Sequence, residues 1–552
     1  MSGKTRAPFL RSPPFPGVAP QHAAISEVCA GAISPDRISD ALLDAIVQAR
    51  VGGDFWGKTG KSVRAVVADE AFLSGLGETS DVAGSIGLLS GGLLRRSEKF
   101  RSSAIILLAR ETDPWALVEQ AESVHAGPEA DVAIVAGLLG KPVFGLDGER
   151  IPPAILRRSA RSRIAAARYR DCFSGEPSAI EDAVAQLAEW RDVLERNRDI
   201  AAATGMAWWK RDAIARFLWD GRRSPPFLSE GRAIEKARMM GGAIAIWPSR
   251  VSGAIREKKS PQQVPVVHIE DGFLRSRGLG AAMHKSSSIV VDRAGIYYDA
   301  RHESDLERLL ATHDFSPALL ERAQVLRERI CATGASKYGA TRGQTVDLPP
   351  GRRTVLAVGQ VEDDLSVRFG GKGVTSNLDF LRRVREAEPD AWILYRPHPD
   401  VRAGHRKGHV SDAQALAYAD RIDATAPLMD LIERIDAVHV LSSLTGFEAL
   451  LRERSVIVHG MPFFAGWGLT RDLAPPPARR ARLLTLDQLV AATLILYPRY
   501  LDPVTRLPCR PELIVERMAT GAMSPSTWLT RVRVVQGTIR RLAILAAEKL
   551  HG

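Results

Sequence analysis

Short apolar runs alternate with helical segments through residues 240–500 of this chain. Such alternation is typical of βαβ units in a mostly parallel sheet, because each buried strand needs a crossover helix before the next one. We predict strands in two groups, at 243–247, 264–269 and 288–291 and then at 355–358, 391–395, 437–441 and 456–458. The pattern therefore predicts an α/β fold with two Rossmann-like halves that face each other across a cleft.

Part of this pattern also occurs earlier in the chain. Residues 117–125 parallel 431–439, and residues 168–171 parallel 499–502 at a larger offset, so the earlier copy has lost loops. The earlier copy also lacks the acidic and histidine-containing loops of the later one. We predict a truncated, non-catalytic module at 1–200, linker helices at 201–228, and a complete module at 229–520 whose halves split near 340.

The last segment, residues 521–552, carries apolar residues at helical spacing beside arginines, for example Leu542 and Leu545 beside Arg540 and Arg541. A basic amphipathic helix of this kind lies on a membrane surface in some proteins and packs on the protein body in others. The sequence predicts the helix and leaves both locations open.

Composition narrows the function classes. The chain has 552 residues, of which 45% are hydrophobic and 25% charged, as in soluble proteins with several domains. The 75 Lys+Arg outnumber the 64 Asp+Glu, and they are spread along the chain, which suits anionic small molecules or lipid better than a nucleic-acid groove. The four cysteines form no metal or disulfide pattern, and no run resembles a signal peptide or a spanning helix. We therefore expect a cytoplasmic protein without a nucleic-acid partner.

Acidic residues follow two of the predicted strands. Glu270 and Asp271 directly follow the predicted strand at 264–269, and residues 362–364 are three acids shortly after the predicted strand at 355–358. Ligands of α/β sheets bind at the carboxyl ends of the strands. Adjacent carboxylates repel one another unless they bind a cation, share protons or do chemistry. The alternatives are solvated acidic turns and, for 362–364, a metal site.

Two further loops carry groups that bind phosphate. His398 lies between two prolines after a predicted strand, so its imidazole is held in one direction. Ser442 and Ser443 lie where a strand ends and a helix begins, and helix N-termini attract anions. A structural histidine and an ordinary helix cap are the alternatives.

These loops resemble those of a known family. In order and spacing, the segments at 270–276, 295–299, 336–338, 359–364, 396–400, 442–451, 462–468 and 497–500 are similar to those of the capsule polysaccharide β-Kdo transferases of the KpsC type. Members typically carry two full modules in tandem, each of which adds a Kdo residue to a lipid-linked acceptor. The first module of this chain is shortened and lacks the motif residues. The resemblance therefore implies a single transferase activity.

The resemblance implies a GT-B-like fold, CMP-Kdo as the donor, retention of the anomeric configuration, and neither a metal nor another cofactor. Asp364 would be the nucleophile of a double displacement, and Glu270 or Asp271 the acid/base. The CMP-binding candidates are His398, Ser442, Ser443 and Glu448, of which Glu448 would bind the ribose. The candidates for the Kdo carboxylate or the phosphate are Arg275, Arg277, Lys337 and Arg396.

The resemblance also implies partners, and it leaves competing functions open. We expect a lipid-linked or oligosaccharide acceptor, an inner-membrane polysaccharide assembly complex, and a peripheral location at the inner face of the inner membrane. The open alternatives are a transferase that uses another CMP-sugar, such as a sialic acid, and a non-catalytic scaffold of the assembly complex. A sugar-nucleotide epimerase is disfavoured by the segments at 271–273 and 466–468.

Overall fold

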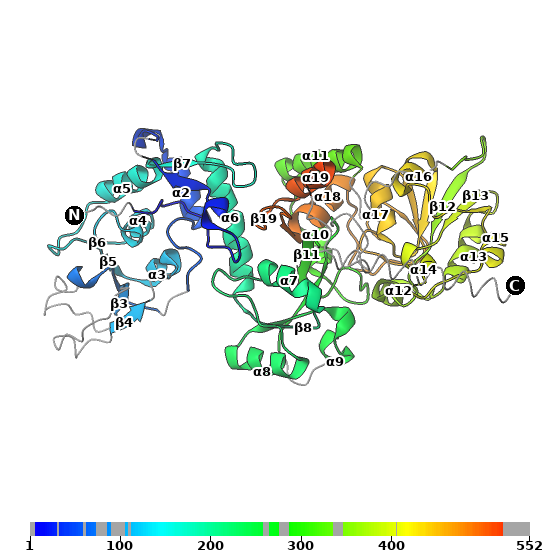
Figure 1. Ribbon diagram of the computed structural model, residues 1–552, viewed down its shortest axis with the longest axis horizontal. Coiled ribbons are helices and arrows are strands. Elements are labelled where there is room, and N and C mark those ends of the chain that lie inside the picture. Colours follow the sequence, from blue (N-terminus) through cyan, green and yellow to red (C-terminus); the bar gives the residue numbers. More distant parts are fainter. Residues whose placement is uncertain are drawn as a thin grey trace. The chain divides into compact units, whose positions relative to one another are not determined.

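The chain folds into two units (Figure 1). The computed structural model describes residues 6–29, 32–58, 62–72, 86–89, 105–108, 112–257, 264–274, 286–334, 346–404 and 406–522. Unit 1 comprises residues 1–199 and 218–225, and unit 2 comprises 200–217 and 226–552. The predicted helix in 521–552 lies outside the described residues. None of the helices that the structure describes is both long enough and apolar enough to cross a membrane.

The first sheet of unit 2 has six strands in the order β19-β18-β11-β10-β9-β8. Its strands are β8 (Ile200–Thr204), β9 (Ala243–Ile246), β10 (Val266–Asp271), β11 (Ser288–Asp292), β18 (Pro498–Leu501) and β19 (Pro508–Cys509). The pairs β8–β9 and β9–β10 are parallel, whereas β10–β11, β11–β18 and β18–β19 are antiparallel.

Two expectations about this part of the chain were wrong. Residues 201–228 do not form linker helices alone, because β8 lies at their start and pairs with β9 as a fully buried edge strand. The two halves are not separated by one cut near 340, because the chain returns from the second half to add β18 and β19 to the first sheet. Sequence periodicity detects a strand but not the distant strand with which it pairs.

The second sheet of unit 2 is parallel throughout, in the order β14-β13-β12-β15-β16-β17. Its strands are β12 (Thr354–Val358), β13 (Trp392–Arg396), β14 (Arg421–Ile422), β15 (Ala437–Val440), β16 (Ser455–Val458) and β17 (Arg471–Asp472). The expected strands of this half are confirmed. Together the two sheets form the two Rossmann-like lobes of a GT-B-like module.

Helices connect the strands of unit 2. They are α7 (Arg211–Phe217), α8 (Glu230–Met240), α9 (Gly253–Arg256), α10 (Asp305–Thr312), α11 (Pro317–Thr333), α12 (Leu365–Gly370), α13 (Asn377–Ala387), α14 (Pro399–Arg402), α15 (Asp412–Leu416), α16 (Leu428–Arg434), α17 (Leu444–Leu451), α18 (Leu486–Val490) and α19 (Pro511–Thr520). Short turns at Trp208–Lys210 and Pro248–Arg250 precede α7 and α9, and a π-helical segment, Ala491–Leu496, follows α18.

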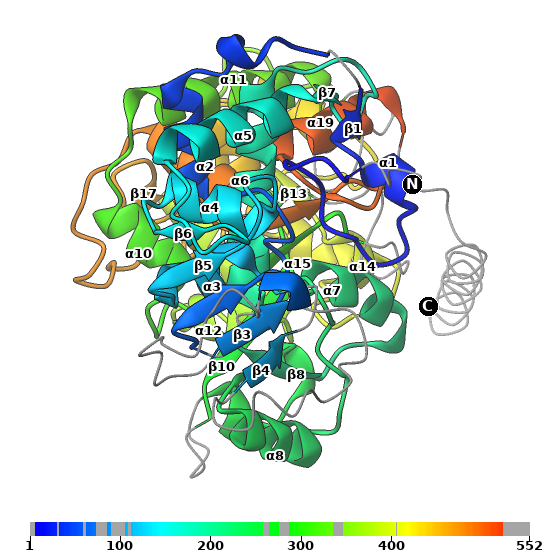
Figure 2. The same cartoon turned by 90° about the vertical axis from the view of Figure 1, so that its left-hand side faces the viewer.

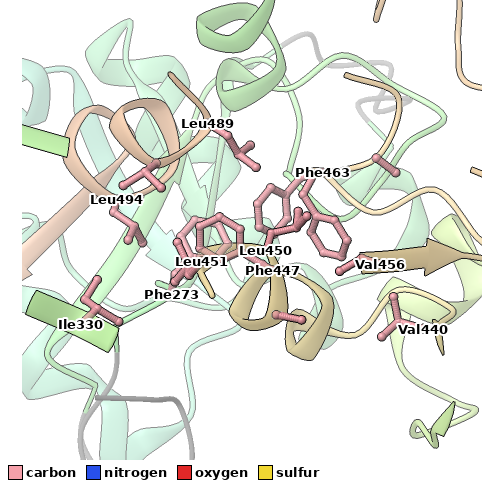
Figure 3. Close-up of a cluster of buried hydrophobic side chains, with 14 of the residues drawn as sticks. Phe273, Ile330, Val440, Phe447, Leu450, Leu451, Val456, Phe463, Leu489 and Leu494 are labelled. Carbon is pink, nitrogen blue, oxygen red and sulfur yellow. The ribbon is translucent and has the colours of Figure 1, made fainter. Parts of the chain in front are cut away.

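One buried cluster joins the two lobes of unit 2 (Figure 3). Phe273 follows β10 of the first sheet, and its ring lies 4.9 Å from that of Phe463, which follows β16 of the second. Phe447 of α17 lies 5.4 Å from the same Phe463 ring. Because burial of such aromatic side chains stabilises by about 1.5–3 kcal/mol each, this cluster stabilises the contact between the two lobes.

Unit 1 contains a five-stranded parallel sheet in the order β4-β3-β2-β5-β6. Figure 2, which turns this unit toward the viewer, shows β3, β4 and β5 of the sheet together. The strands are β1 (Ser26–Val28), β2 (Ala65–Val67), β3 (Ile86–Leu89), β4 (Ile105–Leu108), β5 (Ser123–His125), β6 (Val143–Phe144) and β7 (Ala167–Tyr169), where β1 and β7 form a separate antiparallel pair. The helices are α1 (Pro20–Ala23), α2 (Asp40–Ala49), α3 (Pro114–Gln120), α4 (Asp131–Leu138), α5 (Pro153–Ala165) and α6 (Ile180–Asn197), with short turns at Pro35–Arg37 and Glu70–Phe72.

The two units share a strand order, as the predicted internal repeat requires. The order β4-β3-β2-β5-β6 of unit 1 matches β14-β13-β12-β15-β16 of unit 2, with α3 and α16 at equivalent positions. Local hydrogen bonds match as well, because Tyr169 donates to the Ile164 carbonyl at 2.8 Å and Tyr500 donates to the Leu494 carbonyl at 2.7 Å. Within the described part of unit 1, the five-stranded sheet corresponds to that of the second lobe and the β1–β7 pair corresponds to part of the first.

Two buried histidines lie within the second lobe. His439 Nδ1 and His459 Nε2 are 3.0 Å apart, and His439 Nε2 lies 3.4 Å from a Glu388 carboxylate oxygen. Burial lowers the pKa of His439 to about 4, although Glu388 acts in the opposite direction. Burial, followed by His439 itself, lowers the pKa of His459 to about 3. Both imidazoles are therefore neutral in the folded protein at neutral pH.

We expect acid to destabilise unit 2 through this pair. An unfolded histidine takes up a proton below pH 6.5, and the folded ones do not until about pH 4 or lower, so stability is full above pH 6.5 and is lost as the pH falls toward 4. The loss from His439 alone is on the order of 3 kcal/mol. Urea unfolding at several pH values measures this loss of unfolding free energy. The double variant His439→Gln/His459→Gln should flatten the dependence, whereas His409→Gln, at an exposed position, should not.

Candidate active site

A cavity of about 640 Å³ lies between the carboxyl ends of the strands in the two sheets of unit 2. Six of the residues predicted from the sequence line it: Glu270, Asp271, Asp364, His398, Ser442 and Ser443. They come from four segments that are far apart in the sequence: Glu270 and Asp271 end β10, and the other three segments follow a strand, as expected for an α/β sheet.

Asp364 lies at the start of α12 and lines the cavity. Its carboxylate caps α12 by accepting the Ser366 backbone N–H at 2.9 Å, and its side chain is 48% exposed. The adjacent acids turn elsewhere, since Asp363 pairs with Arg406 at 3.1 Å and Glu362 accepts the Asn377 backbone N–H at 2.8 Å. Arg406 also lies 4.0 Å from Asp364, so these partners relieve the repulsion within 362–364 while Asp364 lines the cavity.

Glu270 and Asp271 end β10 and differ in their surroundings. Both carboxylate oxygens of Asp271 accept from Lys210 Nζ, at 2.7 and 2.8 Å. The ammonium of Lys210 also lies 3.8 Å from the centroid of the Trp247 ring. Glu270 accepts the Asp271 backbone N–H at 3.1 Å and is half-buried at the cavity wall. Lys210 was not predicted as a site residue, because its segment was expected to link the modules.

His398 has a defined orientation. It caps α14, and its Nδ1 accepts the Asp400 backbone N–H at 3.1 Å. A neutral imidazole whose Nδ1 accepts carries its proton on Nε2. His398 therefore offers an N–H donor from Nε2, as an anionic ligand requires.

Ser442 and Ser443 begin α17. Ser443 is the helix N-cap and accepts the Thr445 backbone N–H at 3.3 Å. Gln360 holds Ser442 from both sides, because its carbonyl accepts the Ser442 backbone N–H at 2.6 Å and its amide donates to Ser442 Oγ at 2.9 Å. Gln360 is itself fixed by Asn377, which accepts its backbone N–H at 2.8 Å. The sequence pattern could not predict this residue, because its partner lies 82 positions away.

Two of the remaining predicted residues, Glu448 and Arg396, do not line the cavity. Glu448 is buried in α17, and Arg396 donates to the Ala426 carbonyl at 2.7 Å; neither lines the cavity. Arg275, Arg277 and Lys337 lie outside the described residues. The roles of these five residues stay predictions.

A buried aspartate that was not predicted positions the tyrosine loop of the cavity. Asp292 accepts the backbone N–H groups of Ala294 and Gly295 at 3.0 and 2.7 Å, and Tyr497 donates its hydroxyl to the other oxygen at 2.8 Å. Burial, with a contribution from Asp305, raises the pKa of Asp292 to about 6. These bonds fix the loop that carries Tyr297 and Tyr298, both of which line the cavity.

The cavity combines two kinds of chemistry. Carboxylates of Glu270 and Asp364 face it, while the Nε2 donor of His398 and the N-terminus of α17 also face it. Carboxylates suit nucleophilic or acid/base work at a sugar carbon, and the donors suit a departing phosphate. The arrangement fits the transfer of a sugar from a nucleotide donor.

Sequence comparison places residues 242–500 in a family described as capsule polysaccharide biosynthesis protein. The chain is 34% identical over 423 residues to the capsule polysaccharide modification protein LipA of Neisseria meningitidis serogroup A. That alignment covers 72% of this chain and 60% of LipA, so the chain spans about three fifths of that relative. It is also 39% identical over 322 residues to the lipopolysaccharide-processing protein LpsZ of Rhizobium meliloti, covering 56% of this chain and 72% of LpsZ.

Among solved structures, the chain is similar to Thermosulfurimonas dismutans KpsC, described as a beta Kdo 2,7 transferase. The two are 32% identical, the TM-score is 0.49, and the match covers 58% of this chain and 99% of the KpsC chain.

Proposed function

Because this chain belongs to the capsule polysaccharide biosynthesis protein family, we propose that unit 2 is a glycosyltransferase that makes a bacterial surface polysaccharide. The observation that supports this most directly is the common cavity of Asp364, Glu270, His398, Ser442 and Ser443. For the donor we propose CMP-Kdo, since the loops that line this cavity are those that resemble the KpsC-type transferases. The acceptor would be a lipid-linked glycan or an oligosaccharide.

The proposed reaction is a double displacement with retention. A carboxylate oxygen of Asp364 attacks the anomeric carbon, the bond from that carbon to the phosphate oxygen breaks, and CMP leaves. Nε2 of His398 and the serine-capped N-terminus of α17 would stabilise the departing phosphate. The acceptor hydroxyl then attacks the same carbon from the opposite face, gives its proton to a general base, and releases Asp364.

Glu270 is the better candidate for that general base. Asp271 already accepts two hydrogen bonds from Lys210, so its lone pairs and its charge are engaged. Glu270 lines the same cavity and is half-buried there.

We expect Glu270→Gln to lower kcat by about 100-fold or more, the usual contribution of general acid/base catalysis. Asp271→Asn keeps an acceptor for Lys210 and should lower kcat by less than about tenfold. The measurement is release of CMP in the presence of an acceptor, with thermal unfolding as the control for folding. A larger loss in Asp271→Asn than in Glu270→Gln would assign the base to Asp271, and equal losses would contradict the preference for Glu270.

The donor is tested by offering the wild-type protein freshly generated CMP-Kdo and CMP-sialic acid in separate reactions with a glycan acceptor. Transfer of Kdo alone supports the proposal. Transfer of sialic acid alone would keep the transferase and replace the donor, and CMP binding without turnover of either donor would favour a scaffold in an assembly complex.

For unit 1 we propose a structural role, because it retains the sheet of the second lobe but not the acidic and histidine loops of unit 2. We further propose that the protein works in the cytoplasm at the inner face of the inner membrane, where lipid-linked acceptors and an assembly complex would be available.

A further inference from the structure

The donor cavity adjoins a smaller cavity of about 210 Å³, and both are lined by Arg256 and Tyr298. Among the residues that the structure describes, the other lysine and arginine side chains near this cavity differ from Arg256 in their partners. Lys210 is engaged by Asp271, Arg406 is engaged by Asp363, and Arg368 is exposed on α12. Arg256 thus lies where the two cavities meet, and its environment differs from those of Lys210, Arg406 and Arg368.

Arg256 has a guanidinium group with unused donors. Its Nη1 lies 3.4 Å from the Pro248 carbonyl oxygen, a long contact, and its carbon Cζ lies 5.7 Å from the centroid of the Phe369 ring. Its Nε is buried and has no hydrogen-bond partner among the residues that the structure describes. A buried guanidinium nitrogen without a partner is costly unless an anion binds to it, and a carboxylate matches the geometry of the guanidinium group.

Tyr298 supplies a second unused donor at the same place. Its hydroxyl is buried and, within the described part of the chain, has no hydrogen-bond partner. Burial raises the pKa of this hydroxyl well above its usual value, and Glu270 and then Asp364 are among the charges that raise it further. The hydroxyl is therefore a permanent donor that lies near both of the proposed catalytic carboxylates.

The chemistry of the donor requires an anion site at this position. In Kdo, as in sialic acid, the carboxylate is bonded directly to the anomeric carbon. If Asp364 attacks that carbon, the sugar carboxylate must lie beside Asp364 and Glu270. Three carboxylates so close together repel one another strongly unless a cation and hydrogen-bond donors compensate.

We propose that Arg256 and Tyr298 together bind the carboxylate of the donor sugar. The inference rests on the proposed function and adds the residues that recognise a 2-keto sugar acid. The guanidinium neutralises the carboxylate through its unused edge, and the tyrosine hydroxyl donates to one carboxylate oxygen. A neutral sugar on the same nucleotide would leave both donors unfilled, so the pair selects for acidic donor sugars.

The test separates recognition of the sugar from recognition of the nucleotide. We would measure kcat/KM for CMP-Kdo and, by calorimetry, the affinity for CMP alone, in wild type, Arg256→Met, Arg256→Lys and Tyr298→Phe. Arg256→Met should lower kcat/KM by about 10- to 100-fold, as for loss of hydrogen bonds between charged groups, and change CMP affinity less than twofold. The kcat/KM of Arg256→Lys should lie between those of wild type and Arg256→Met, and Tyr298→Phe should lower kcat/KM by about five- to tenfold.

Two controls keep the outcome interpretable. Arg308→Met removes an exposed arginine of the smaller cavity that is paired with Glu303, and it should leave kcat/KM unchanged. Arg256→Met should not lower the thermal midpoint, because Arg256 gives up no ion pair; a purely structural role would lower it.

The outcomes are distinct. If wild type turns over CMP-Kdo and Arg256→Met does so equally well, the carboxylate site is rejected while the proposed function stands. The same holds if Arg256→Met lowers kcat/KM and CMP affinity by the same factor. A wild-type protein that turns over neither CMP-Kdo nor CMP-sialic acid rejects the proposed function, and the carboxylate site with it.

Discussion

Replacing Asp364 with asparagine should lower Kdo transfer at least about 1,000-fold, because an amide cannot form the ester with the anomeric carbon that double displacement requires. The fold should remain intact. Asparagine caps helices as well as aspartate does, so it can still accept the Ser366 backbone N–H that Asp364 accepts at 2.9 Å. Loss of activity in this variant therefore reports on chemistry rather than on α12.

Intact-protein mass spectrometry identifies the covalent step directly. Wild type incubated with freshly generated CMP-Kdo and no acceptor should gain the mass of one Kdo residue, and the peptide around Asp364 should carry it. Asp364→Asn should gain nothing. Asp363→Asn is the matched control, because Asp363 pairs with Arg406 rather than capping the helix, and it should lose less than about tenfold in activity. An adduct on Asp364→Asn would place the nucleophile elsewhere.

The second large effect is on stability and arises at Arg480. This guanidinium is 2% exposed, donates to the Pro462 and Ala465 carbonyls at 2.6 and 2.8 Å, and lies 3.2 Å from Glu307. Burial lowers the pKa of Arg480, and Glu307 opposes that shift. The side chain thus links α10 of the first lobe to the loop of Pro462 and Phe463 at the cavity wall.

Arg480→Met should lower the free energy of unfolding by about 3–5 kcal/mol, because it leaves Glu307 with a diminished counter-charge and two buried carbonyls without their donor. Urea unfolding followed by tryptophan fluorescence measures the loss. Arg479→Met is the matched comparison, since Arg479 also contacts Glu307 but is 31% exposed, and it should cost about 1 kcal/mol or less. Similar losses in the two variants would contradict the assignment of the buried charge to Arg480.

Sequence patterns were most informative where structure depends on near neighbours. Apolar runs marked β9 to β13 and β15 to β16 because a buried parallel strand needs continuous hydrophobic side chains. The loops after those strands marked Asp364, Glu270, His398 and Ser442, because the carboxyl ends of strands gather at one edge.

The sequence was least informative where one residue depends on a distant one. Lys210 acts on the site only through its contact with Asp271, and Gln360 only through its contact with Ser442. Asp292 gains its role from Tyr497, which lies 205 positions later in the sequence. Periodicity contains no information about such pairings, so these residues could be found only once the fold was known.

The return of the chain to the first sheet has a mechanical consequence. The polypeptide passes between the lobes of unit 2 twice, once between β11 and β12 and once between β17 and β18. Two covalent connections between the lobes define a hinge axis. Relative movement of the lobes is thereby restricted to opening and closing about that axis, and shearing of one lobe past the other is opposed. Such a motion would admit the donor and release CMP, and closure would bring Glu270 of the first lobe to Asp364 and the phosphate-binding groups of the second.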